Sequence, residues 1–126
     1  MGVIINISLL NKNNTKIAEL ASDEKLITDI QSALDLVMTV KYETGADRIL
    51  LDKKNVVEAF FILSSGLAGE ILQKFMNYHV KVAFYGDYTR YTSKPLKDFI
   101  YESNKGNDFF FVDSKEEAIE KLENAH

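Results

Sequence analysis

The chain of 126 residues contains no cysteine, no tryptophan and a single proline, and it has no excess of positive charge. Without cysteine, disulfides, thiol catalysis and cysteine-based zinc sites are excluded. The net charge of −4 at pH 7 argues against general nucleic-acid binding, which depends on basic surface that neutralises phosphates. No apolar run has the roughly 20 residues of a membrane-spanning helix, and the first residues lack the basic segment of a signal peptide. We therefore expect a soluble, cytoplasmic protein with no membrane partner.

The composition is that of an ordinary globular domain. Apolar residues make up 46% of the sequence and charged residues 27%, a balance typical of proteins that bury a hydrophobic core. A chain of this length can form such a core without disulfides or metal ions. We expect one domain that spans residues 1–126.

Apolar patterns along the chain predict the α/β class. Five segments predict strands, at residues 3–9, 15–20, 49–51, 80–85 and 109–112. Helices are expected to begin at a Thr28 capping box with Gln31, after Ser65, around Pro95 and at a Ser114 capping box. An opening hairpin followed by alternating strands and helices, in the order β-β-α-β-α-β-α-β-α, predicts a mixed, mostly parallel sheet with right-handed crossovers.

Helical spacing of apolar residues predicts which helix faces are buried. In the helix that begins at Thr28 and ends at Gly45, the expected core residues are Ile30, Ala33, Leu34, Val37 and Met38. In the helix after Ser65, the expected core residues are Leu67, Ala68, Ile71, Leu72, Phe75 and Met76. Both sets follow the helical period, which places their members on one side of a helix.

The most informative motif is Ser64-Ser65-Gly66, which follows an apolar stretch and opens an amphipathic helix. The first N–H groups of a helix have no partners within the helix and lie at the positive end of its dipole. Hydroxyl groups beside them can help to hold a phosphate, or Ser64 can receive one. The alternative is a plain helix cap, a role in which serine contributes about 1 kcal/mol to stability.

A second motif, residues 86–94, combines aromatic, cationic and hydroxyl side chains. Arg90 and Lys94 can clamp a phosphate or carboxylate, with Tyr88 or Tyr91 as a flat contact surface. Because ligands of open α/β sheets bind at the carboxyl ends of parallel strands, we expect this loop to lie near Ser64. Tyrosine and arginine are enriched at interfaces, so a protein partner fits as well as a small ligand. The alternative is a solvated loop whose tyrosines lie at the sheet edge.

Aspartates end or follow three of the predicted strands, at Asp52, Asp87 and Asp113. Clustered carboxylates bind Mg²⁺, so a small metal-dependent enzyme that uses Asp52 and Asp87 is the alternative function. Such aspartates more often serve turns and helix caps. The sequence has no glycine-rich dinucleotide loop, no P-loop and no histidine pair with metal-ligand spacing. We therefore predict no catalytic residues and no cofactor, and we expect a binding domain rather than an enzyme.

The order of the elements and the segment Phe61–Leu67 resemble STAS domains of the anti-sigma-factor antagonist type. In those domains a helix opens with Asp-Ser-Ser-Gly-Leu, and a partner kinase phosphorylates the first serine. The resemblance implies that Ser64 is the phosphoacceptor. Leu63 stands where STAS domains carry the aspartate that helps to present the loop to the kinase.

A more specific resemblance is to a bacterial family called domain of unknown function 4180. It covers most of the chain and rests on Glu43–Asp52, on Gly66–Phe75, and on the stretch from Tyr91–Lys94 to Asn104–Gly106. This resemblance implies a bacterial origin and brings no established activity.

The leading hypothesis is a non-enzymatic regulatory domain that recognises a protein partner or a small anionic ligand. The expected contact residues are Ser64, Ser65, Gly66, Tyr88, Arg90, Tyr91 and Lys94. A homodimer in which the exposed tyrosines of two copies meet is a third interpretation.

Overall fold

The computed structural model describes residues 5–126, in which five strands form one mixed sheet. The strands are β1 (Asn6–Lys12), β2 (Thr15–Ala21), β3 (Arg48–Asp52), β4 (Lys81–Tyr85) and β5 (Phe109–Val112), and they lie in the order β1-β2-β3-β4-β5. The first two are antiparallel, and every other neighbouring pair is parallel. The α/β class and the mixed, mostly parallel sheet are confirmed. Residues 3 and 4 of the first predicted strand lie outside the described residues.

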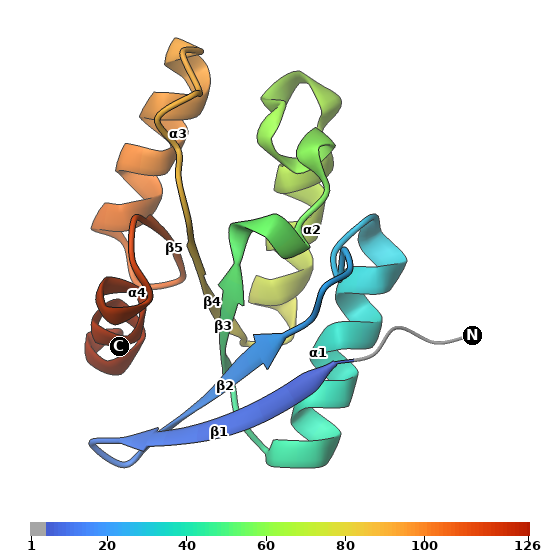
Figure 1. The fold of residues 1–126 in the computed structure, drawn as a ribbon, viewed down its shortest axis with the longest axis vertical. Helices are drawn as coiled ribbons and strands as arrows, with labels where there is room; N and C mark the ends of the chain where they lie inside the picture. Colours follow the sequence, from blue (N-terminus) through green and yellow to red (C-terminus); the bar gives the residue numbers. More distant parts are fainter. Residues whose placement is uncertain (1–4) are drawn as a thin grey trace.

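Helices cover both faces of this sheet. They are α1 (Ile30–Thr44), α2 (Leu67–Asn77), α3 (Lys94–Lys105) and α4 (Lys115–Asn124). Buried side chains of α1, α2 and α3 join one core cluster, and those of α4 join a second cluster on the other face. Figure 1 shows α1 and α2 on one side of the sheet and α4 on the other. Two packed faces explain why β3 and β4 are apolar at every central position, since a strand covered on both sides has no solvent-facing side chains.

Helix α1 begins one residue later than the predicted capping box. Its N-cap is Asp29, whose side chain accepts a hydrogen bond from the N–H of Ser32, and the Ser32 hydroxyl accepts one from the N–H of Asp29. The prediction of Thr28 and Gln31 was therefore wrong, because serine three residues after Asp29 supplies the reciprocal bond. The predicted end at Gly45 is confirmed, and its φ of +73° is a conformation that glycine adopts without strain.

The buried faces of α1 and α2 differ from the prediction at one edge of each face. Met38 and Met76 are exposed, whereas Leu36 and Val40 belong to the core of α1. Each residue of a helix turns the chain by about 100°, so a methionine directly after a central core residue already points away from the sheet. The other central positions of α2, among them Phe75, are buried as predicted.

The long connection between β3 and α2 contains three 3₁₀ turns, η1 (Lys53–Asn55), η2 (Glu58–Phe61) and η3 (Leu63–Ser65). The sequence pattern did not predict them, because turns this short have no repeating apolar period. Among residues 5–126, every helix is too short or too polar to span a membrane.

Replacement of Phe75 by alanine tests the central contact of α2. Phe75 is fully buried, so we expect Phe75→Ala to lower the free energy of unfolding by about 3–5 kcal/mol. The neighbouring Met76 is 46% exposed, and Met76→Ala should change it by about 0.5 kcal/mol or less. Denaturant unfolding of both variants measures the difference, and equal losses would contradict this helix orientation.

Candidate functional site

Two connections rise above the carboxyl ends of the parallel strands and enclose a cleft between them. One leads from β3 through η2 and η3 to α2, and the other leads from β4 to α3; Figure 1 shows both at the upper end of the fold. The cleft has a volume of about 590 Å³. Its walls are formed by Glu58, Phe61, Ile62, Leu63 and Ser64 on one side and by Arg90, Tyr91, Thr92, Ser93, Pro95 and Leu96 on the other.

The two adjacent serines differ in what their hydroxyl groups do. Ser65 donates to the carbonyl oxygen of Ala59 at 2.8 Å and accepts from the N–H of Leu67 at 3.2 Å. Its hydroxyl therefore closes the turn and supports the start of α2. Gly66 follows with a φ of +78°, which turns the chain into the helix. Ser64 is exposed and lines the cleft.

The two tyrosines of the second motif have different surroundings. Tyr88 packs edge-on against Phe61 and Phe111, with ring centroids 6.0 and 6.3 Å away, and its hydroxyl donates to the carbonyl oxygen of Phe84 at 3.0 Å. Burial raises the pKa of Tyr88. Both tyrosine rings pack against the core, but only Tyr91 lines the cleft.

The two cations of the second motif are also separated. Arg90 lines the cleft, whereas Lys94 does not. Lys94 begins α3 and forms an ion pair with Asp98 one turn later, at 2.6 Å. Its ammonium group lies in solvent along the outside of the helix. The charge that the second motif brings to the cleft therefore comes from Arg90.

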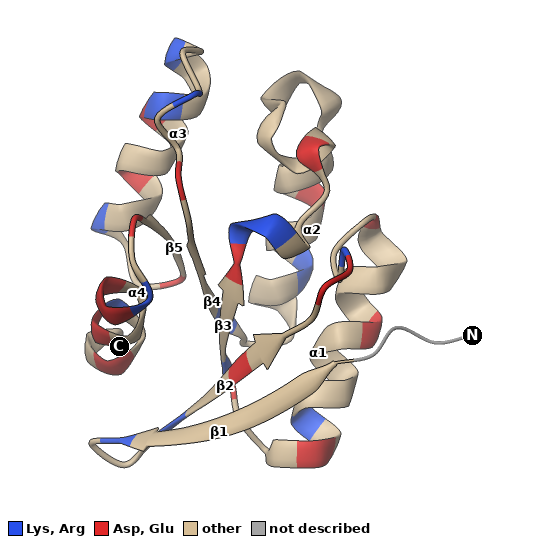
Figure 2. Ribbon diagram, viewed as in Figure 1, with Lys and Arg blue, Asp and Glu red and all other residues tan. Residues whose placement is uncertain are grey.

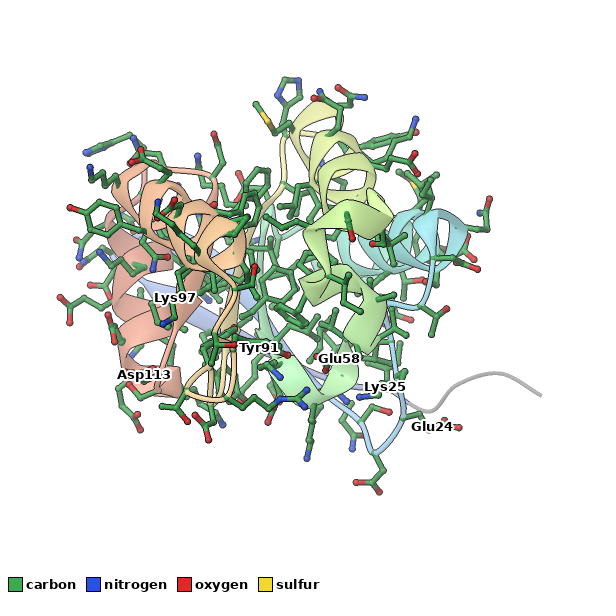
Figure 3. All side chains as sticks on the ribbon, turned by 90° about the horizontal axis from the view of Figure 1, so that it is seen from above. Glu24, Lys25, Glu58, Tyr91, Lys97 and Asp113 are labelled. Carbon is green, nitrogen blue, oxygen red and sulfur yellow. The ribbon has the colours of Figure 1, made fainter. Side chains whose placement is uncertain are left out.

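Glu58 joins the two walls, and the sequence analysis missed it. One carboxylate oxygen accepts a hydrogen bond from Arg90, and the other accepts one from the Tyr91 hydroxyl at 2.9 Å. Figure 3 shows Glu58 and Tyr91 next to each other at the centre of this end of the molecule. No local pattern marks Glu58, because its partners lie more than thirty positions away in the sequence.

The ammonium group of Lys53 lies over three aromatic rings that pack below or along the cleft. It is 4.7 Å from the ring centroid of Tyr91, 4.9 Å from that of Phe61 and 5.8 Å from that of Tyr88, within the range of cation–π attraction. The stem of Lys53 passes directly over Gly86, where a Cβ atom would lie only 2.8 Å from the Cβ of Lys53. Gly86 therefore lets the ends of β3 and β4 approach closely enough for this contact.

Two of the three strand-end aspartates, Asp52 and Asp87, hold the turns that follow their strands. Asp52 accepts from the N–H of Lys54 at 2.8 Å, and Asp87 accepts from the N–H and the hydroxyl of Thr89 at 2.8 and 2.6 Å. The hydrogen bonds from Thr89, together with nearby cations, lower the pKa of Asp87. In the described part of the chain, no group of three histidine, cysteine, aspartate or glutamate side chains is arranged to hold a metal ion. The metal-dependent alternative thus rests on two carboxylates that already bind main-chain N–H groups.

Acidic and basic positions are interspersed along the helices rather than separated into regions of one sign (Figure 2). The fold and the cleft together define a small α/β domain whose distinctive surface lies at the carboxyl ends of its parallel strands.

The family model described as domain of unknown function (DUF4180) matches residues 12–122, so the chain belongs to this family, as its sequence resemblance predicted. No curated protein and no solved structure matches the chain.

The close approach at Gly86 can be tested by adding one methyl group. Gly86→Ala should lower the free energy of unfolding by about 1–3 kcal/mol, because the new Cβ overlaps the Cβ of Lys53, which cannot swing aside. Gly69 is the matched control, since a Cβ there meets open space in α2, and Gly69→Ala should stabilise by about 0.5–1 kcal/mol. Denaturant unfolding measures both values. A neutral Gly86→Ala variant would show that this contact does not constrain the strand ends.

The buried hydroxyl of Tyr88 predicts a loss of stability at high pH. Above the ordinary tyrosine pKa of 10.0, the unfolded chain releases this proton while the folded chain retains it, so the free energy of unfolding falls as the pH rises. Tyr88→Phe should make this fall smaller, and the exposed Tyr101→Phe should leave it unchanged. Urea unfolding between about pH 9 and pH 11 measures the slope. An identical slope in wild type and Tyr88→Phe would contradict the burial of this group.

Proposed function

We propose that the protein is a non-enzymatic regulatory domain that binds a small anionic ligand, or an anionic group of a protein partner, in the cleft. The observation that carries the proposal is that Arg90 and Ser64, from segments far apart in the sequence, line one open cleft. A guanidinium group with hydroxyl groups nearby is a usual receptor for carboxylates and phosphates.

The surroundings of Arg90 favour an anion. Both α2 and α3 begin at this end of the sheet, and the N-cap Ser93 and Pro95 of α3 line the cleft. The positive ends of helix dipoles stabilise negative charge within the first turn. Apolar side chains such as Ile62 and Leu63 form much of the remaining walls, so the cleft suits an anion with an apolar body.

The resemblance to STAS domains supports a second role for Ser64, as the acceptor of a phosphoryl group from a partner kinase in a bacterial cytoplasm. Ser64 is exposed at the rim of the cleft, while the neighbouring Ser65 hydroxyl is engaged in the turn. A phosphate on Ser64 would change the charge of the cleft and thereby switch its affinity for a partner.

The proposal is tested by exchanging Arg90 and Lys94 separately for glutamine. We expect 4-phenylbutyrate and inorganic phosphate, used as probes, to shift the amide resonances of residues 58–64 and 90–96 in the ¹⁵N-labelled protein. Arg90→Gln should weaken binding by at least about tenfold, because a hydrogen bond between charged groups is lost. Lys94→Gln removes the same charge outside the cleft and should leave the dissociation constant nearly unchanged.

Equal affinity of Arg90→Gln and wild type, or shifts confined to other parts of the molecule, would contradict the proposal. For a protein partner, the same two variants serve as bait in cell lysate, and the partner should be lost with Arg90→Gln alone. Sedimentation at several concentrations tests the homodimer interpretation separately.

A further inference from the structure

The polar donors of the cleft already hold a carboxylate, that of Glu58. We propose that the ligand of the cleft is a small carboxylate with an apolar body, and that Glu58 is an internal competitor which this ligand displaces. The inference rests on the proposed function, because it assigns the ligand class and the regulation of the same cleft.

The geometry of the donors matches one carboxylate group. Arg90 and the Tyr91 hydroxyl each bind a different oxygen of Glu58, and the Arg90 Nη2 and Tyr91 hydroxyl oxygen are 3.3 Å apart. Two neighbouring donors directed at two oxygens fit a planar carboxylate. The Glu58 side chain therefore occupies the position, and demonstrates the binding mode, that a ligand carboxylate would take.

The Tyr91 hydroxyl is held in place by the packing of its ring. The ring stacks on Phe61 with a centroid distance of 5.5 Å and an interplanar angle of 27°, and the ammonium group of Lys53 lies 4.7 Å from its centroid. Phe61 is itself buried, so this support does not depend on the ligand. A donor fixed before binding loses little conformational freedom when a ligand arrives.

Glu58 is suited to leave this position. The side chains of Arg90 and Glu58 are 62% and 49% exposed, so water can solvate both groups once they separate. Exposed ion pairs of this kind contribute little to stability. Because Glu58 is attached to the same chain, it competes at a high effective concentration and lowers the affinity for any carboxylate from solution.

The apolar walls of the cleft indicate that the rest of the ligand, beyond its carboxylate, is apolar. Ile62, Leu63 and Pro95 line the cleft beside the polar group, and Ile62 is among the exposed large apolar residues of the protein. A volume of about 590 Å³ lies within the range of sites for small organic molecules. A free inorganic anion would leave these apolar walls uncovered, whereas an aliphatic or aromatic carboxylate would cover them.

The test compares wild type, Glu58→Gln and Glu70→Gln with three probes. Glutamine at position 58 keeps the size of the side chain and removes its charge; Glu70, on α2, lies outside the cleft lining and controls for net charge. Dissociation constants for 4-phenylbutyrate, 4-phenylbutyramide and inorganic phosphate are measured from ¹⁵N amide shifts at constant ionic strength. We expect Glu58→Gln to bind 4-phenylbutyrate about five- to tenfold more tightly than wild type, since a neutral amide competes less well for Arg90. Glu70→Gln should match wild type, and the amide probe should bind weakly to all three proteins.

Two results would overturn the inference while leaving the proposed function intact. One is that Glu58→Gln binds 4-phenylbutyrate no more tightly than wild type, although Arg90→Gln loses binding. The other is that phosphate binds more tightly than 4-phenylbutyrate. If neither anion shifts cleft resonances in wild type or in Glu58→Gln, both proposals fail. Thermal unfolding of Glu58→Gln and Glu58→Ala establishes that the variants are folded, as the exposure of Glu58 leads us to expect.

Discussion

The packing of Phe60 onto the sheet fixes the wall of the cleft that carries Glu58. Phe60 belongs to the short turn η2 and is almost completely buried, with its ring centroid 5.4 Å from that of Phe84 and 6.3 Å from that of Phe111. A turn of four residues has too few internal hydrogen bonds to hold its own position. The side chains that η2 presents to the cleft therefore depend on its two buried rings, Phe60 and the neighbouring Phe61.

The opposite wall of the cleft, formed by the connection from β4 to α3, packs on the same two aromatic residues, Phe84 and Phe111. Tyr88 binds the carbonyl oxygen of Phe84 and packs against Phe111, and the Asn104 side chain of α3 pairs with both main-chain groups of Phe111 at 2.7 and 3.0 Å. Both walls thus take their position from the ends of β4 and β5. These rings and the Asn104 amide set the distance between the walls, whereas the groups at the rim, such as Arg90, are exposed.

The buried strands and the C-terminal end of α1 could be predicted from the sequence because their signals are local. Wholly apolar runs mark strands covered on both faces, and Gly45 marks a left-handed helix end. The contact between Glu58 and Arg90 could not be predicted, because it joins residues 32 positions apart and depends on how two turns pack. The sequence also does not distinguish Tyr88 from Tyr91, since they share one loop. Both rings pack against the core, and only the folded structure shows that Tyr88 binds the carbonyl oxygen of Phe84 whereas Tyr91 lines the cleft.

The balance of charge around the cleft is compatible with the proposed binding of an anion, although the net charge of the protein is −4. Lys53 and Arg90 supply two positive charges at the base and rim, and Glu58 and Asp87 supply two negative ones. In the proposed exchange, a ligand carboxylate that takes the place of Glu58 would pair with Arg90 in the bound state as Glu58 does in the free state. The displaced Glu58 would move into water, where a carboxylate is well solvated. Binding as we propose it is an exchange of one carboxylate for another, and the gain in affinity would come from the apolar walls that only the ligand covers.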